Sequence, residues 1–162
     1  MIEIYKDVAG FESFFKISNI GNLYSKRTKR NLKKHIDDHG YESVATKIGG
    51  RNGVNVCFKI HRLVADAFLK EPEKYIIDSA KSTSYGTIPV NHKDGNKKNN
   101  SHENLEWCTY KENTSHALAT GLIMYPTPEH GTKARYKRGC RCSLCKSEYS
   151  IKRREQYLRT GK

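Results

Sequence analysis

The sequence lacks the marks of membrane, secreted and disulfide-rich proteins. No apolar run approaches the roughly 20 residues of a membrane-spanning helix, and the N-terminus has no basic patch followed by an apolar stretch. The number of cysteines is odd, at five, so a framework of paired disulfides is not expected. Apolar residues are only 36% of the 162 positions, yet ten Tyr, five Phe and one Trp are too many for plain disorder. We expect a soluble intracellular protein of one or two small domains.

Negative charge is also scarce, since 17 Asp and Glu stand against 30 Lys and Arg. Residues 1–60 carry 11 basic and 6 acidic side chains, residues 61–120 carry 8 and 8, and residues 121–162 carry 11 and 3. Two basic ends around a neutral centre indicate a polyanionic partner, whereas a merely soluble surface would not cluster its charge. A nucleic-acid enzyme and a ribosome-associated protein both fit this distribution.

The N-terminal part of the chain predicts short strands and turns. Residues 40–45 and 54–60 form apolar-rich stretches joined by a Gly-rich turn, which is typical of a hairpin. From residue 61 to 69 the apolar spacing changes to that of a helix. Residues 71–89 predict an irregular connection.

The centre of the chain predicts the order strand, long loop, strand, helix. A short strand leads to His92, and a second covers residues 105–108. Thr109 and Glu112 have the spacing of a capping box, so a helix is expected from residue 110 to about 120. Two prolines in residues 122–129 indicate a linker to a basic module.

Polar side chains of this centre have the chemistry that phosphodiester hydrolysis needs. An amide oxygen that accepts from one ring N–H of His92 would fix its tautomer, and the other nitrogen could then take a proton from water. We consider Asn104 for that amide. The oxygens of Asn91 and Asn113 suit a hard divalent cation beside the scissile phosphate. The residues alone do not select this set, because His before Asp-Gly and Asn in loops are common in turns.

Four stretches of the centre carry a family pattern: Val90–Asn100, Glu103–Trp107, Glu112–Asn113 and His116–Ala117. Together they resemble the HNH nuclease motif of phage and intron-encoded homing endonucleases. Residues 1–60 are similar to the modular DNA-binding segment that often precedes that motif. The resemblance implies a β-rich DNA-binding segment (1–60) and a ββα-metal HNH core (61–121). With the linker (122–129) and a basic zinc-binding module with a C-terminal helix (130–162), which the residues themselves predict, we expect an α+β fold of four parts.

The resemblance also implies roles for single residues. His92 would be the general base and Asn104 would orient it, while Asn91 and Asn113 would bind one Mg²⁺ or Mn²⁺. The family more often has Asp or His at the position of Asn91, and a neutral amide is a weaker ligand. His116 would lie near the metal or serve in packing or phosphate contact. The implied activity is nicking of double-stranded DNA by a monomer, in the cytoplasm of a bacterial or phage-infected host cell.

Two other functions remain open on the sequence alone. Because the neutral amide of Asn91 is a weak metal ligand, one alternative is a DNA-binding protein with weak or lost catalysis. The basic composition keeps open an RNA- or ribosome-binding protein.

Basic side chains at both ends of the chain are candidates for DNA contact, with a solvated charged surface as the alternative. In the N-terminal segment a β-ribbon would fit a major groove. The candidates there are Lys26, Arg27, Lys29, Arg30, Lys33, Lys34 and Arg51. In the C-terminal module they are Arg141, Lys152 and Arg153, the last two on a helix predicted over residues 146–159.

The C-terminal module also carries three cysteines and a histidine at the spacing of a structural zinc site, with free thiols as the alternative. The predicted ligands are His130, Cys140, Cys142 and Cys145. A module of about 30 residues has too little core to fold alone, so a metal would stabilise it. Cys57 and Cys108 lie in strand contexts and are predicted to be small buried side chains.

Overall fold

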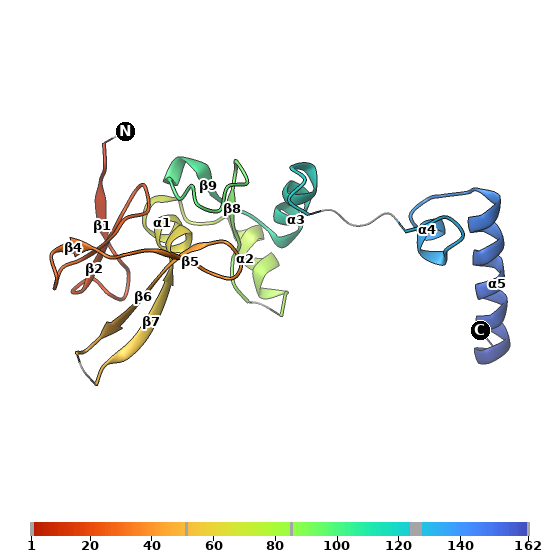
Figure 1. Ribbon diagram of the computed structural model, residues 1–162, viewed down its shortest axis with the longest axis horizontal. Coiled ribbons are helices and arrows are strands. Elements are labelled where there is room, and N and C mark those ends of the chain that lie inside the picture. The colour runs from red at the N-terminus through yellow and green to blue at the C-terminus, as the bar shows by residue number, and fades with distance from the viewer. Residues whose placement is uncertain (1, 51, 85, 124–127, 162) are drawn as a thin grey trace. The chain divides into compact units, whose positions relative to one another are not determined.

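A computed structural model describes residues 2–50, 52–84, 86–123 and 128–161 (Figure 1). The chain forms two compact units, Met1–Leu122 and Ile123–Lys162. Arg51 and residues 124–127 of the predicted linker lie outside the described residues. In the part of the chain that the structure describes, no helix has the length and apolar character that crossing a bilayer requires. The finer four-part division of the chain stays a prediction.

The first unit has a mixed α+β fold with antiparallel strands, as predicted. Its first sheet has the order β1 (Tyr5–Asp7), β2 (Phe15–Ser18), β3 (Leu23–Ser25) and β4 (Arg30–Asn31). Its second sheet has the order β5 (His35–Ile36), β6 (Glu42–Ile48) and β7 (Val54–Lys59). Alternate residues face inward, so Phe15 and Ile17 of β2 are buried, and Phe15 meets Phe58 of β7 edge to face at 5.5 Å.

Helix α1 (Ile60–Phe68) lies at the centre of the first unit. Ile60, Val64 and Ala65 are fully buried at helical spacing. The helix contacts strands of both sheets and the hairpin of β8 (Val90–His92) and β9 (Leu105–Trp107). It therefore joins the N-terminal strands to the predicted nuclease core in one apolar cluster.

The predicted order of strand, loop, strand and helix is confirmed. Strands β8 and β9 pair antiparallel, and the loop between them ends in the single turn η1 (His102–Asn104). Helix α3 (Tyr110–Ala119) begins at the predicted capping box, in which Thr109 Oγ1 accepts from the Glu112 backbone N–H and the Glu112 carboxylate accepts from the Thr109 N–H.

Two predictions for the first unit are wrong. The connection over residues 71–89 contains helix α2 (Lys74–Lys81), because Ile76 and Ala80 are buried at i, i+4 spacing. Two apolar positions give too short a periodic signal to identify a helix. Cys57 is exposed, since its neighbour Phe58 faces the core and successive strand residues alternate, whereas Cys108 is buried as predicted.

The second unit consists of helices α4 (Lys133–Lys137) and α5 (Ser143–Thr160). Thr132 caps α4 by accepting from the Arg135 N–H. The predicted C-terminal helix begins earlier than expected, at Ser143. The helical spacing predicts that three apolar residues face the module: Leu144, Ile151 and Leu158. All three are exposed instead. Cys145 is the one buried side chain among the described residues of α5.

Candidate functional site

His92, the predicted general base, ends strand β8 and is only 5% exposed. Its Nε2 lies 3.1 Å from Oδ1 of Asn100. An amide oxygen can only accept, so this hydrogen-bond network assigns the proton to Nε2 and the free lone pair to Nδ1. Burial lowers the pKa of His92 and favours the neutral ring. Nδ1 has no hydrogen-bond partner among the described residues. It is not fully buried, so solvent reaches it.

Asn104 does not make the predicted contact with His92. Its side chain accepts from the Asp94 N–H at 3.1 Å and donates to the Asp94 carboxylate and the Asn99 carbonyl, both at 2.9 Å. Asn104 therefore holds the loop between β8 and β9 closed, and Asn100 takes the place at the imidazole. The loop is rich in Asn, and no spacing rule in the sequence separates these amides.

Asn91 points to the opposite face of β8 and is 7% exposed. Its Nδ2 donates to Oε1 of Glu106 at 2.8 Å, across the register that pairs the two residues. This bond turns the NH₂ group of Asn91 toward Glu106 and leaves Oδ1 available to bind a cation or to accept a hydrogen bond. Glu106 is a functional candidate that the sequence reasoning missed, because the long loop between β8 and β9 leaves the hairpin register undetermined from the sequence.

Asn113 lies in the first turns of α3 and is half-buried, and its side chain has no hydrogen-bond partner among the described residues. The structure thus joins Asn91 to Glu106 and records no direct bond to Asn113. The ligand atoms that these side chains could offer to a metal are amide and carboxylate oxygens, which by their chemistry fit Mg²⁺ or Mn²⁺. His116 Nε2 lies 3.0 Å from the Lys93 carbonyl oxygen, which favours its packing role over metal binding.

Tyr41 and His61 form a ring cluster with His92. The centroid of His61 lies 4.8 Å from that of Tyr41 and 5.4 Å from that of His92. Nδ1 of His61 is buried and has no partner among the described residues. Burial and, second, the neighbouring His92 lower the pKa of His61 to about 3.

We expect this histidine to make the first unit acid-sensitive. An unfolded histidine has a pKa near 6.5, so below about pH 6.5 the unfolded state binds the extra proton and the free energy of unfolding falls as the pH falls. The loss from His61 is about 1.4 kcal/mol per pH unit down to its folded pKa. Urea unfolding followed by Trp107 fluorescence at pH 7 and pH 5 measures it. His61→Phe keeps the ring, so an equal loss in this variant would contradict the assignment.

The predicted DNA contacts of the N-terminal segment divide into free and paired side chains. Arg27, Lys29, Arg30 and Lys33 are exposed around the β3–β4 turn and the segment after it. Lys26 forms an ion pair with Asp7 at 2.6 Å, and Lys34 forms one with Glu42 at 2.6 Å.

The predicted DNA contacts of the second unit are partly engaged within it. The guanidinium of Arg141 lies 4.1 Å from the ring centroid of Tyr136, and Tyr136 stacks on Tyr149 at 4.1 Å. Lys152 pairs with Glu155 at 3.2 Å, and Arg153 is exposed.

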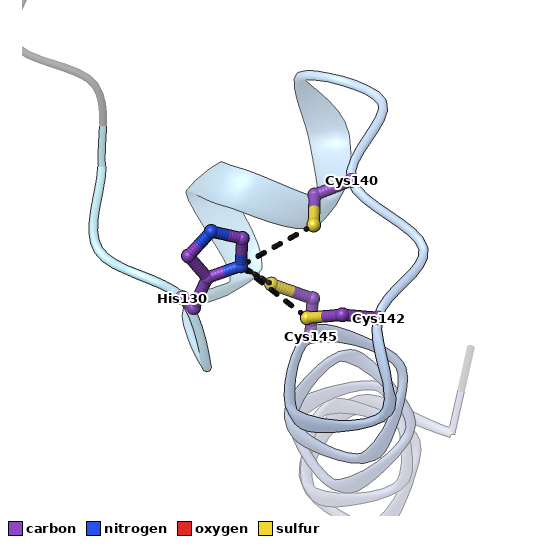
Figure 2. Close-up of side chains that lie close together, drawn as sticks. All are labelled: His130, Cys140, Cys142 and Cys145. Carbon is purple, nitrogen blue, oxygen red and sulfur yellow. Dashed lines mark hydrogen bonds between the residues drawn. The ribbon is translucent and has the colours of Figure 1, made fainter.

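Four side chains of the second unit converge, as Figure 2 shows: His130, Cys140, Cys142 and Cys145. Nδ1 of His130 lies 3.3, 3.5 and 4.0 Å from the sulfurs of Cys142, Cys140 and Cys145, and the four ligand atoms are all within 4.8 Å of one another. In a tetrahedral zinc site with ordinary Zn–S and Zn–N bonds, nitrogen and sulfur lie about 3.5 Å apart. The cluster therefore has the size and ligand types of a zinc site.

The backbone around the cluster favours thiolates. The N–H of Cys142 is the main cause that lowers the pKa of Cys140 to about 6, although burial raises the pKa of Cys145. The N–H of Gly131 donates to the Cys145 sulfur at 3.3 Å. All five cysteines are free, so no disulfide competes for these sulfurs.

Two family models match the chain. One, described as HNH endonuclease, matches residues 83–115, and the other, described as NUMOD4 motif, matches residues 3–46. The first range contains β8, β9 and His92, and the second contains the first sheet and β5. Neither range includes a residue of the second unit.

Named relatives are similar to about three quarters of this chain. The DNA endonuclease I-HmuI of Bacillus phage SP01 is 34% identical over 119 residues, which are 74% of this chain and 60% of that protein. An uncharacterized HNH endonuclease of Acanthamoeba polyphaga mimivirus, L245, is 34% identical over 122 residues, 75% of this chain and 32% of that protein.

A solved structure gives the same likeness in three dimensions. It is described as DNA binding and cleavage by the HNH homing endonuclease I-HmuI, and it aligns with a TM-score of 0.61 at 33% identity. The alignment covers 75% of this chain and 62% of that chain. This chain therefore spans less than two thirds of the length of each of these relatives.

Proposed function

Because residues 83–115 match the HNH endonuclease family model and residues 3–46 match the NUMOD4 motif, we propose that this protein is a metal-dependent endonuclease of double-stranded DNA. The observation that carries the proposal is the 3.1 Å contact between Nε2 of His92 and Oδ1 of Asn100, which leaves Nδ1 as the nitrogen available to accept a proton. The solved relative is described as binding and cleaving DNA, which supports DNA as the substrate.

In this proposal the residues of the β8–β9 hairpin have distinct tasks. Nδ1 of His92 takes a proton from the water that attacks the scissile phosphate. Asn91, with its Oδ1 left as an acceptor by Glu106, and Asn113 would hold the divalent ion. When bound, that ion would neutralise charge on the phosphate and the leaving oxygen. Asn104 keeps the connecting loop closed around these groups.

Basic side chains at both ends would bind the duplex. We assign the phosphate contacts of the first unit to the exposed set Arg27, Lys29, Arg30 and Lys33, with Lys26 and Lys34 beside them. A chain with one such histidine, acting as a monomer in a bacterial or phage-infected host cell, would cut one strand per encounter. Nicked DNA is then the expected first product.

We further propose that the cluster of His130, Cys140, Cys142 and Cys145 holds a structural zinc ion. Four protein ligands complete a tetrahedron and leave no position for a reacting water, which distinguishes a structural from a catalytic site. The ligands come from the segment before α4, the loop after it and the first turn of α5, so one ion would join all parts of the second unit.

The test of the function is incubation of supercoiled plasmid with the purified full-length protein and Mg²⁺ or Mn²⁺. Nicked circles should accumulate with either ion and not with a chelator. Binding of duplex DNA without cutting would favour the catalytically inactive alternative. Preferential binding of structured RNA in a competition with duplex DNA would favour the RNA-binding alternative.

Asn91→Asp tests the role of the amide at the metal site. The new carboxylate would face the Glu106 carboxylate at the place of a 2.8 Å hydrogen bond, so the metal-free protein should lose about 1–3 kcal/mol of unfolding free energy. A carboxylate is also the stronger ligand, so nicking should need less Mg²⁺. The measurements are thermal unfolding without metal and a Mg²⁺ titration of nicking.

The double variant Asn91→Asp with Glu106→Gln is the matched control for stability. It restores a donor and an acceptor across the pair and should recover the lost stability. A large gain of activity over a nearly inactive wild type would support the weak-enzyme alternative. A higher Mg²⁺ requirement in Asn91→Asp would contradict the metal role of residue 91.

A further inference from the structure

Asn100 has a single orientation that satisfies its neighbours. It is 2% exposed in the loop between β8 and β9, where its Nδ2 donates to Oε2 of Glu42 at 2.9 Å. A carboxylate can only accept, so the NH₂ group must face Glu42 and the oxygen must face His92. The charge of Glu42 thus determines which way the amide points.

Glu42 lies 58 residues before Asn100 in the chain. It opens strand β6 within the NUMOD4 range, and Nζ of Lys34 lies 2.6 Å from the same Oε2. A chain of contacts therefore runs from Lys34 through Glu42 and Asn100 to His92. It crosses from the segment proposed to bind DNA to the residue proposed to be the base.

The backbone around Asn100 is fitted to the same N-terminal segment. Gly21 has a φ of +92°, and a Cβ added there would lie 2.9 Å from Cβ of Asn100. The N–H of His102 donates to the carbonyl of Asn19 at 2.8 Å. The turn around residues 19–21 thus packs directly on the loop that carries Asn100, so the backbone and Cβ of Asn100 are held in place while the amide group can still turn over.

We infer that Glu42 and Asn100 are positioning residues that set the tautomer of His92. Glu42 fixes the amide, the amide oxygen holds the proton on Nε2, and Nδ1 is left as the atom that accepts from water. The inference rests on the proposed function for its catalytic meaning, but the tautomer is a property of the metal-free protein. This series fixes the direction of each hydrogen bond. The carboxylate can only accept from the amide NH₂, and the amide oxygen can only accept from the imidazole N–H.

Exchanging the two charges of the ion pair tests the inference. The double variant Lys34→Glu with Glu42→Lys keeps an ion pair and the net charge, but it presents a donor to Asn100. The amide should turn over, its NH₂ should face His92, and the proton should move from Nε2 to Nδ1. Long-range ¹H–¹⁵N spectra of the imidazole, recorded on the metal-free full-length protein with the ring neutral, distinguish the two nitrogens.

The matched control is the same exchange in another ion pair of the segment, Lys26→Asp with Asp7→Lys. It moves an equivalent charge without touching Asn100, so the His92 tautomer should stay as in the wild type. Asn100→Asp with Glu42→Gln is a second variant, in case the exchange at residues 34 and 42 does not fold. The Gln amide can donate to the new carboxylate, which then offers only acceptors to His92, so the proton should remain on Nε2, and a proton on Nδ1 would contradict the inference.

The kinetic readout is the single-turnover rate of plasmid nicking at saturating protein. A general base contributes about 10²–10⁴-fold, so the exchange at residues 34 and 42 should lower the rate by about 10² or more. Because Lys34 is also a proposed phosphate contact, DNA binding by the variant is measured first, and the protein concentration is raised until the plasmid is fully bound. A proton on Nδ1 in the wild type, or an unchanged tautomer in the exchange variant, would overturn the inference. A reversed tautomer in a protein whose wild type does not cut DNA would support the inference and refute the proposed function.

Discussion

Replacement of His92 by alanine is expected to lower the rate of plasmid nicking about 10²–10⁴-fold, because a positioned general base contributes that much. The single-turnover rate is the quantity to measure, and DNA binding should be retained, since His92 is 5% exposed and offers little surface to the duplex. His39→Ala is the matched control, because that imidazole is exposed and lies outside the ring cluster. Equal nicking by His92→Ala and the wild type would end the catalytic assignment.

The same substitution removes a ring from a buried cluster, so stability and chemistry must be separated. Loss of the contacts with Tyr41, His61 and Asn100 should lower the unfolding free energy by about 1–3 kcal/mol. Circular dichroism at the assay temperature shows whether the variant is folded. Imidazole added to the buffer should then restore part of the rate to folded His92→Ala. Recovery by imidazole has no explanation in a purely structural role.

Cys145→Ser is expected to abolish zinc binding and unfold the second unit. Cys145 is the one fully buried apolar side chain among the described residues of that unit, so apart from the stack of Tyr136 on Tyr149 little apolar packing holds α4 against α5. Structural zinc contributes about 10–16 kcal/mol in zinc-finger peptides, far more than so small a core supplies. Metal analysis of the reduced wild type should give about one zinc per chain. Limited proteolysis should remove the region after residue 123 from the variant only.

Cys57→Ser is the control for this experiment, since Cys57 is exposed and lies outside the cluster. Nicking by the first unit should survive in Cys145→Ser under conditions of low salt, where the remaining basic side chains still bind phosphate. A freshly purified, reduced wild type without zinc would refute the zinc assignment. So would a Cys145→Ser variant that resists the protease as the wild type does.

Local spacing in the sequence was sufficient to predict the features that depend on neighbouring residues. The capping box at Thr109 and Glu112 fixed the start of α3, and the Gly-rich turn fixed the β6–β7 hairpin. The convergence of His130 with three cysteines also followed from spacing, because those ligands lie within sixteen consecutive residues. In each case the partners are close in the chain, so few alternative arrangements exist.

Contacts between distant segments were not predictable in the same way. Choosing Asn100 over Asn104 as the partner of His92 requires Glu42, which lies 58 residues away and fixes the amide. The pairing of Asn91 with Glu106 depends on the hairpin register, which the long loop leaves undetermined. Helix α2 was missed because its buried face has only Ile76 and Ala80. Sequence reasoning thus predicted features set by neighbouring residues better than contacts between distant segments.

The fit of Gly21 and Glu42 against Asn100 limits how freely the region after residue 60 could be recombined with other N-terminal segments. A chimaera joined near residue 60 would bring a foreign turn and a foreign side chain to the loop beside His92. Exchange of the N-terminal segment would therefore require that positions 21, 42 and 100 be inherited together, as a matched set.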